Sequence, residues 1–406
     1  MKKQYGLLGV GLLFSLLASA QVQQGKWNAK LLRADGHHIP FELDVKTQKG
    51  KTDFYVVNGT ERLKTETTAL GKDSLLIRMP VFESSFRVKL IGKDSLSGVW
   101  VKGGTEKDAV IPFVAVAGKN RFPIAKGTKP ANAQGRWKID FTRANGSKRA
   151  ALGEFTQKGQ VLRGSVLTPS GDYRYLDGIV NGDSLAFSTF DGIHALLFTA
   201  KVQNGQLNGN FYSGGTSTES WTAVQDAKAK LEAPITQVKE DSDGRLNFSF
   251  KDLDGKTVSF PSDRYKDKVV IIQLMGSWCP NCMDEMAFLS EYYHKNKARG
   301  IEVIALAYEL TTDEERSRKS LARFQEQFKV EYPMLNTGVA VGDPKRTEKT
   351  LPQITDVKVF PTSIIIDKKG VINEINTAFS GPATGEHFTH YKAEFEQKIN
   401  SLLSAK

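Results

Sequence analysis

The stretch VVIIQLMGSWCPNC, residues 269–282, joins an apolar run to two cysteines. Val269–Leu274 has the continuous apolar character of a central strand that is covered on both faces. Cys279 and Cys282 follow it closely, at the point where a helix is expected to begin. The free N–H groups and the positive dipole end of a helix N-terminus stabilise a thiolate, which is the attacking form of cysteine. We therefore expect Cys279 to be an exposed nucleophile and Cys282 to be the resolving thiol.

These two cysteines are the only ones in the chain of 406 residues. A disulfide between them closes almost no loop, so it constrains the unfolded chain little and adds little stability. The spacing therefore favours redox chemistry over a structural bridge. Half of a zinc site is the alternative, but zinc needs two further ligands. His387 and His390 are spaced for one helix face, and nothing in the sequence ties them to the cysteines.

Residues 244–406 alternate between strand and helix patterns, which predicts a parallel or mixed sheet with helices on its faces. After the strand that precedes the cysteines, we expect further strands at Ile301–Ala307, Thr362–Ile366 and Val371–Ile375, and helices at Met283–Arg299, Thr312–Phe328 and Glu386–Leu403. Thr311 or Thr312 is the expected N-cap of the middle helix.

Two motifs in this part of the chain resemble those of a known family. Trp278-Cys279-x-x-Cys282, with Glu285 three residues on, is similar to the TlpA/ResA-like group of extracytoplasmic thioredoxin-fold oxidoreductases. The segment Val359-Phe360-Pro361-Thr362, which runs into a strand, follows in the order that this group has. The resemblance covers about residues 245–404 and implies an α/β thioredoxin-like domain with thiol–disulfide oxidoreductase activity. It leaves the first half of the chain unexplained.

The resemblance also implies a role for each residue of the two motifs. Pro361 would follow a cis peptide bond and face the cysteines, and the Phe360 backbone would pair with the extended chain of a client. Trp278 would flank the nucleophile with a flat contact surface. Glu285 would assist proton transfer to and from the thiols. The alternative for Glu285 is a solvated carboxylate in the first turn of a helix.

Two positions depart from the family pattern. Gln273 lies six residues before the first cysteine, where thioredoxin has a buried aspartate, and a glutamine cannot accept a proton. Met286 stands where many members have a proline that kinks the helix, so we expect a straighter helix. The direction of the reaction depends on how far the thiolate is stabilised. The uncharged Pro280-Asn281 pair favours a reducing or intermediate poise, and hence a protein-disulfide reductase.

The first half of the chain contains an internal repeat. Five short matches recur in the same order at offsets of 109 to 111 residues: Gln24–Trp27 with Gln134–Trp137, Arg33–Gly36 with Arg143–Gly146, Thr47–Gly50 with Thr156–Gly159, Asp73–Leu75 with Asp183–Leu185, and Leu96–Gly98 with Leu207–Gly209. We interpret residues 22–125 and 132–225 as two copies of one unit. Alternating stretches such as Lys51–Val57 and Ser85–Leu90, separated by turn residues, predict an antiparallel sandwich or barrel in each copy.

The remaining two segments are an expected linker and an expected signal peptide. Residues 226–243 are polar and charged and are the expected linker. Residues 1–20 have the pattern of a secretory signal peptide: Lys2 and Lys3, an apolar run from Gly6 to Leu17, and Ala18-Ser19-Ala20 as the cleavage site. We therefore expect export to the periplasm or cell envelope, without a membrane span after cleavage.

The composition is that of a folded soluble protein, with 40% hydrophobic and 25% charged residues. The formal charge of +11 is spread along the chain without a basic cluster or a recognisable module, so nucleic-acid binding is not expected. No cofactor or bound metal is expected. The expected partners are thiol- or disulfide-bearing protein clients and an upstream electron donor, either membrane-bound or soluble.

Three alternative functions remain open at this level. A thiol peroxidase of the peroxiredoxin type would have a lone peroxidatic cysteine, and the second cysteine does not fit that pattern. A redox-linked copper-handling protein would use soft thiolates for Cu(I), with His294, His387 or His390 as further ligands. The β repeats could instead be a binding module with an accessory redox domain. Four aromatic residues are candidates for lining such a site, although aromatic side chains in β domains more often form the core: Tyr173, Tyr175, Phe190 and Phe198.

Overall fold

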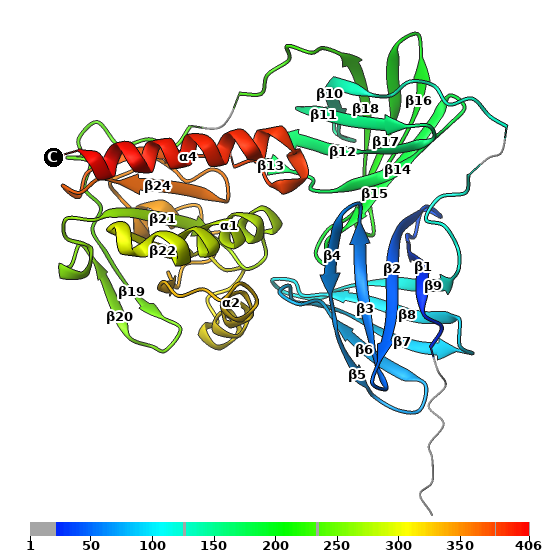
Figure 1. The fold of residues 1–406 in the computed structure, drawn as a ribbon, viewed down its shortest axis with the longest axis horizontal. Coiled ribbons are helices and arrows are strands. Elements are labelled where there is room, and N and C mark those ends of the chain that lie inside the picture. Colours follow the sequence, from blue (N-terminus) through cyan, green and yellow to red (C-terminus); the bar gives the residue numbers. More distant parts are fainter. Residues whose placement is uncertain (1–21, 125–126, 233–234, 378, 406) are drawn as a thin grey trace, which may run out of the picture.

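The computed structural model describes residues 22–124, 127–232, 235–377 and 379–405, and these form two β barrels and one α/β domain (Figure 1). The expected signal segment, 1–20, lies outside the described residues. Within the part of the chain that the structure describes, no helix is both long and apolar enough to cross a membrane. We propose units at 22–125, 132–225 and 244–406 with a linker at 226–243. In the described part of that linker, the β pairing is the isolated bridge between Val238 and Ile354.

Barrel 1 is a nine-stranded antiparallel sheet. Its strands are β1 (Gly25–Leu32), β2 (His38–Gln48), β3 (Lys51–Asn58), β4 (Glu61–Lys64), β5 (Glu66–Ala69), β6 (Ser74–Arg78), β7 (Ser84–Ile91), β8 (Ser95–Lys102) and β9 (Ala109–Ala117). The first and last strands, β1 and β9, pair with each other. The seam of this nearly closed barrel lies between the short strands β4 and β5.

Barrel 2 repeats this arrangement. Its strands are β10 (Gly135–Thr142), β11 (Lys148–Lys158), β12 (Val161–Thr168), β13 (Gly171–Asp172), β14 (Leu176–Asn181), β15 (Ser184–Phe190), β16 (Ala195–Gln203), β17 (Gln206–Ser213) and β18 (Ser217–Gln225). Pairing of β11 with β12 closes the ring, and the two-residue strand β13 extends β12 outward as a hairpin. Of the two predicted architectures, sandwich or barrel, the structure therefore has barrels.

Equivalent residues of the two repeats make equivalent contacts. Trp27 is buried and donates from Nε1 to the Gln23 carbonyl at 2.9 Å, and Trp137 donates in the same way to the Ala133 carbonyl at 3.0 Å. Gly98 and Gly209, which match in the repeat, both lie where neighbouring strands approach closely. A Cβ at Gly209 would stand 1.8 Å from the Thr199 carbonyl oxygen of β16. The repeat thus preserves the contacts that shape each barrel.

Gly209→Ala is expected to destabilise barrel 2 by about 1–3 kcal/mol, because the added methyl group overlaps the backbone of β16. The measurement is the hydrogen exchange of backbone amides in β16 and β17. The matched control is Asn208→Ala, at the neighbouring exposed position of the same strand, which should leave exchange nearly unchanged. Equal amide protection in Gly209→Ala and Asn208→Ala would contradict this prediction, because it would show that the close approach of β16 and β17 does not affect the stability of barrel 2.

The C-terminal domain is a seven-stranded mixed sheet with helices. Its strands are β19 (Phe248–Asp252), β20 (Thr257–Phe260), β21 (Val269–Met275), β22 (Ile301–Ala307), β23 (Met334–Asn336), β24 (Thr362–Ile366) and β25 (Ile372–Asn376), and its helices are α1 (Pro280–Asn296), α2 (Glu314–Phe328), α3 (Arg346–Thr350) and α4 (Glu386–Ser404), with short 3-10 turns at Asp263–Tyr265, Lys297–Arg299 and Pro382–Thr384. The parallel strands β21, β22 and β23 lie at its centre, in the order β20-β19-β23-β22-β21-β24-β25.

The expected elements are present with small shifts at their ends. All residues of β21 and β22 are buried, as their apolar runs predict. The predicted cap of α2 was wrong: the N-cap is Asp313, whose carboxylate accepts from the Arg316 N–H at 2.9 Å, while Thr311 bonds the Asp313 N–H. Helix α1 runs through Met286 without interruption, as expected for a chain that lacks the proline.

The barrels are joined to each other by buried polar contacts. Arg121 is buried and donates from Nη1 to the Ser188 carbonyl of barrel 2 at 3.0 Å, while its Nη2 donates to the Val57 carbonyl of barrel 1. One apolar cluster continues from the core of barrel 1 into the C-terminal domain. The two barrels and the C-terminal domain therefore pack against one another, with both barrels on one side of the C-terminal domain (Figure 1).

Candidate active site

The loop after β21 places both cysteines at the start of α1. Cys279 is the N-cap of the helix, and its Sγ accepts from the Cys282 N–H at 3.1 Å. Pro280 occupies the first helical turn, where its missing N–H costs nothing. Cys279 and Cys282 are joined by a disulfide. The prediction that the pair lies between a buried strand and a helix N-terminus is confirmed.

The expected exposure of Cys279 is wrong. Only 4% of Cys279 is accessible, and Cys282 is fully buried. Burial of the second cysteine beneath the first follows from its place one helical turn further into the domain. Burial of Cys279 has another cause, because this residue belongs to the apolar cluster that barrel 1 and the C-terminal domain share.

The segment around Pro361 lies against the cysteines. The Phe360–Pro361 peptide bond is cis, as the motif predicts. Cys279 Sγ lies 3.6 Å from the Phe360 carbonyl oxygen, so the two motifs, which are far apart in the sequence, meet at one point. A second cis bond, Phe260–Pro261, was not anticipated from the sequence.

Trp278 is half-buried beside Cys279. Its indole Nε1 donates to the Tyr308 carbonyl at 2.8 Å, and its ring meets Phe360 edge to face, with centroids 5.7 Å apart. Gly276 permits this position, because a Cβ there would stand 2.2 Å from the indole nitrogen. The tryptophan is therefore held between Tyr308, which follows β22, and Phe360.

Glu285 is buried inside the domain, with 1% of its surface accessible, so the alternative of a solvated carboxylate is wrong. Its Oε1 accepts from Ser363 Oγ at 2.7 Å and from Tyr391 OH at 3.2 Å, and its Oε2 accepts from Gln273 Nε2 at 2.9 Å. Burial raises the pKa of Glu285 above its usual value, and the three hydrogen bonds oppose that shift.

Gln273 connects this carboxyl to the redox pair. Its Nε2 lies 3.3 Å from the Cys282 carbonyl oxygen as well as within hydrogen-bond distance of Glu285. Its Oε1 is buried and has no hydrogen-bond partner among the described residues. The amide thus replaces the buried aspartate of thioredoxin with a donor to Glu285, which leaves Glu285 as the buried acid nearest to Cys282 along this chain of contacts.

Glu309 is a second buried carboxyl at the site, and the sequence reasoning missed it. It lies two residues after the end of β22 and holds the loop that precedes Cys279: its Oε1 accepts from the Ser277 N–H at 2.8 Å and its Oε2 from Ser277 Oγ at 2.5 Å. Burial raises the pKa of Glu309 to about 7. An acidic residue at the carboxyl end of a central strand was the available signal, because the ends of neighbouring parallel strands meet at one edge of the sheet.

Glu309→Gln is expected to make the C-terminal domain more stable at alkaline pH relative to the wild type. The folded carboxyl keeps its proton up to about pH 7, whereas the unfolded one loses it near its usual pKa of 4.5. Folding therefore becomes less favourable as pH rises through this window, by roughly 3 kcal/mol. A glutamine keeps both bonds to Ser277, with the hydroxyl bond reversed, and removes this penalty.

The check is amide exchange of β21 at about pH 4.5 and about pH 8, corrected for intrinsic exchange rates. Glu314→Gln, at an exposed position on α2, is the control. Parallel pH dependence in wild type and Glu309→Gln would contradict this prediction.

Other candidate residues lie away from the pair. His387 bonds Glu154 of barrel 2 at 2.9 Å and His294 bonds Glu331 at 3.0 Å, whereas His390 is exposed at the start of α4. Three of the four aromatic candidates pack within or against the apolar cores, and only one lines an open cleft: Phe190 and Phe198 are buried, Tyr173 stacks on Phe211, and Tyr175 borders the cleft between barrel 2 and α4.

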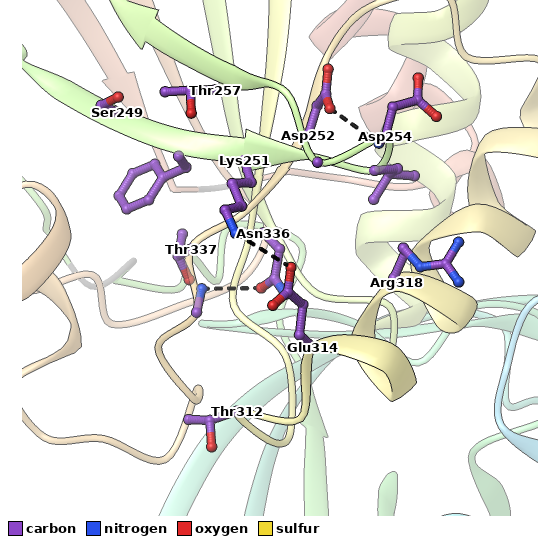
Figure 2. Close-up of a pocket in the computed structure, with 14 residues that line it drawn as sticks. Ser249, Lys251, Asp252, Asp254, Thr257, Thr312, Glu314, Arg318, Asn336 and Thr337 are labelled. Atoms are coloured by element: carbon purple, nitrogen blue, oxygen red, sulfur yellow. Dashed lines mark hydrogen bonds and ion pairs between the residues drawn. The ribbon is translucent and has the colours of Figure 1, made fainter.

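A separate hollow of about 750 Å³ lies beside the β19–β20 hairpin (Figure 2). Figure 2 shows acidic and basic side chains around it, including Asp252, Asp254, Glu314 and Arg318, with Lys251 directed toward Glu314. Neither cysteine and no residue of the Pro361 segment lines this hollow. It is therefore separate from the redox pair.

Comparison with known proteins places the relatives on the C-terminal domain. The model of the AhpC/TSA family matches residues 243–375. The thiol-disulfide oxidoreductase ResA of Bacillus thuringiensis subsp. konkukian is 32% identical over 147 residues, which are 36% of this chain and 72% of that protein. The thioredoxin-like protein YneN of Bacillus subtilis is 28% identical over 154 residues, or 38% of this chain and 75% of that protein.

Among solved structures, a thiol:disulfide interchange protein of the thioredoxin family from Chlorobium tepidum is similar to 41% of this chain. The match covers 99% of that chain, at 20% identity and a TM-score of 0.31.

Proposed function

Because the chain belongs, through its C-terminal domain, to the ResA family of thiol–disulfide oxidoreductases, we propose that it is an exported protein-disulfide reductase that works through Cys279 and Cys282. The observation that carries this proposal is the position of Cys279 Sγ. It receives the N–H of Cys282 at the start of α1 and lies beside the carbonyl of Phe360. These contacts support thiolate formation and client binding at the same sulfur.

The proposed reaction moves two electrons from the dithiol to a client disulfide. The Cys279 thiolate attacks one client sulfur, so a mixed disulfide forms and the other client sulfur leaves as a thiolate. The thiolate of Cys282 then attacks Cys279 Sγ, which releases the first client sulfur and forms the Cys279–Cys282 disulfide. The client gains two electrons and two protons, and an external dithiol donor must supply the same to the enzyme for the next cycle.

Two further roles complete the proposed site. The extended chain of the client pairs with the backbone at Phe360, beside Pro361, and contacts the indole of Trp278. Glu285 accepts the Cys282 proton during release of the client. Its burial raises its pKa, which makes it a stronger base than an exposed carboxylate. Gln273 positions Glu285 relative to Cys282, because its Nε2 contacts both the Glu285 carboxylate and the Cys282 backbone carbonyl, while the proton itself must pass directly or through water.

The reducing direction and the location rest on the sequence. The uncharged Pro280-Asn281 pair gives the thiolate no cationic partner, which favours a reducing poise. Residues 1–20 have the pattern of a signal peptide, so the protein acts outside the cytoplasm and receives electrons from a membrane-bound or soluble donor.

The direction is tested with two peptide substrates, one carrying a disulfide and the other two free thiols. The reduced protein should reduce the first faster than the oxidised protein oxidises the second, at matched concentrations and pH. Faster oxidation would make the protein a disulfide donor. Consumption of hydrogen peroxide at the rate of peptide reduction would instead favour a thiol peroxidase.

A further inference from the structure

The face of the C-terminal domain that carries Cys279 is covered by both barrels. Cys279 shares its apolar cluster with Phe82 of barrel 1 and with Ile193 of the β15–β16 turn in barrel 2. The space that remains beside Trp278 is about 20 Å³, between Glu83 of barrel 1 and the C-terminal domain. A space of this size holds roughly one water molecule and no client chain.

A hairpin of barrel 2 also lies on the segment between the cysteines. Gly171, the first residue of β13, has a φ of +130°. A Cβ at this position would stand 2.3 Å from Oδ1 of Asn281, the residue that directly precedes Cys282. The hairpin backbone therefore occupies the side from which a partner would approach the pair, and Figure 1 shows β13 next to the start of α4.

A buried ion cluster fastens the three units together. Arg174 of barrel 2 is 2% accessible and donates to Asp284 of α1 from Nε at 2.8 Å and from Nη2 at 2.7 Å. The same Nη2 donates to Glu61 of barrel 1 at 2.6 Å. Asp172 accepts from the Gly381 N–H of the C-terminal domain at 3.0 Å. Asp284 lies two residues after Cys282, so the cluster is anchored on the redox helix itself.

A second, partly exposed contact joins barrel 1 to α2. Glu83 of barrel 1 accepts from Arg316 of α2 at 2.6 and 2.9 Å and from Ser320 Oγ at 2.6 Å. The contacts of Glu83 with α2 and of Arg174 with α1 thus tie both barrels to helices of the C-terminal domain.

We propose that the two barrels autoinhibit the redox pair: they mask Cys279 from protein-sized partners, and the contacts of Arg174 with Asp284 and Glu61 hold this closed arrangement. The inference rests on the proposed function, because it concerns the regulation of the same dithiol. Its specific consequence is that access to Cys279 depends on separation of the barrels from the C-terminal domain, while the chemistry of the pair does not.

The test uses the reduced full-length chain and two alkylating reagents, iodoacetamide and a polyethylene-glycol maleimide. Arg174→Gln leaves the carboxylates of Asp284 and Glu61 without their buried cation. Removing one partner of a buried ion pair destabilises the closed arrangement by more free energy than a tenfold change in an equilibrium constant requires. We therefore expect alkylation of Cys279 by the bulky maleimide to be at least about tenfold faster than in the wild type.

Arg163→Gln is the matched control, because Arg163 is an exposed arginine of barrel 2 that pairs with Asp177 of the same barrel. It should leave the alkylation rate unchanged. Glu83→Gln is the second variant and weakens a partly exposed pair, so a rise of about two- to fivefold is expected. Circular dichroism shows which variants are folded. If Arg174→Gln does not fold, the alkylation rate of Glu83→Gln tests the autoinhibition.

The outcomes separate this inference from the proposed function. Folded variants that the bulky maleimide alkylates at the wild-type rate would overturn the autoinhibition, whatever their rate with iodoacetamide. Fast maleimide reaction in the wild type, equal to that of a cysteine-containing peptide, would also overturn it. Loss of reversible exchange with small thiols in every variant would instead contradict the proposed function. Small thiols report on the chemistry of the two cysteines, whereas the bulky maleimide reports on how far the barrels block access to them.

Discussion

Cys279→Ser is expected to abolish reduction of a peptide disulfide, with a loss of at least about 10³-fold, while Cys282→Ser is expected to stop the reaction halfway. The two cysteines differ in their surroundings. Cys279 Sγ receives an N–H at the helix start and lies beside the Phe360 carbonyl, whereas Cys282 is fully buried. A serine at position 279 leaves no thiolate to attack, because a hydroxyl is hardly ionised near neutral pH.

Cys282→Ser keeps the nucleophile and removes the resolving thiol, so the mixed disulfide between Cys279 and the client should accumulate. Non-reducing gels and intact-mass measurements detect this species directly. The double variant, Cys279→Ser with Cys282→Ser, gives the baseline, since the chain has no other cysteine. Accumulation of the adduct in Cys279→Ser instead would reverse the assigned roles.

Glu285→Gln is expected to slow client release by about 10²-fold, the lower end of the range for general acid–base catalysis. The carboxyl is buried and tied to the Cys282 backbone through Gln273, and burial raises its pKa. Below that pKa the group is protonated and cannot accept the Cys282 proton. The wild-type rate should therefore rise with pH through the raised pKa, and this rise should be missing in Glu285→Gln.

A purely structural role for Glu285 predicts a different result. The residue links α1 to Ser363 of β24 and to Tyr391 of α4, so Glu285→Gln also weakens packing. Lost packing would lower the melting temperature and leave the shape of the pH profile intact. Glu291→Gln, at an exposed position of the same helix, is the control and should change neither quantity. An unchanged pH profile in Glu285→Gln would contradict its role in proton transfer.

Local sequence patterns were sufficient to predict the fold of the C-terminal domain. The apolar run of β21 is covered on both faces, so its strand and its buried position follow from composition alone. The two-cysteine spacing at a strand-to-helix junction predicted the position of the candidate site, and the Pro361 motif predicted the segment that lies against it. The repeats could be recognised in the sequence because matching residues make the same contacts in each barrel. Trp27 and Trp137, for example, each donate to the backbone carbonyl four residues before them.

Contacts between units could not be predicted in this way. Arg174 and Asp284 are 110 residues apart, and nothing in the local sequence of either indicates that they meet. The burial of Cys279 has the same origin, because its cover comes from other units of the chain. Glu309 was missed for a related reason: its partner, Ser277, belongs to the neighbouring strand-to-helix loop, and only the assembled sheet edge brings the two together.

The most direct test of the central claim is the redox titration of the Cys279–Cys282 pair in the full chain. The protein is equilibrated in glutathione or dithiothreitol buffers, alkylated, and analysed by mass spectrometry. Our account predicts a single reversible two-electron transition, with a potential below about −200 mV. A potential near −120 mV, at the strongly oxidising end of the scale, would contradict the reductase direction. Absence of any reversible transition would contradict the assignment of this pair as the redox centre.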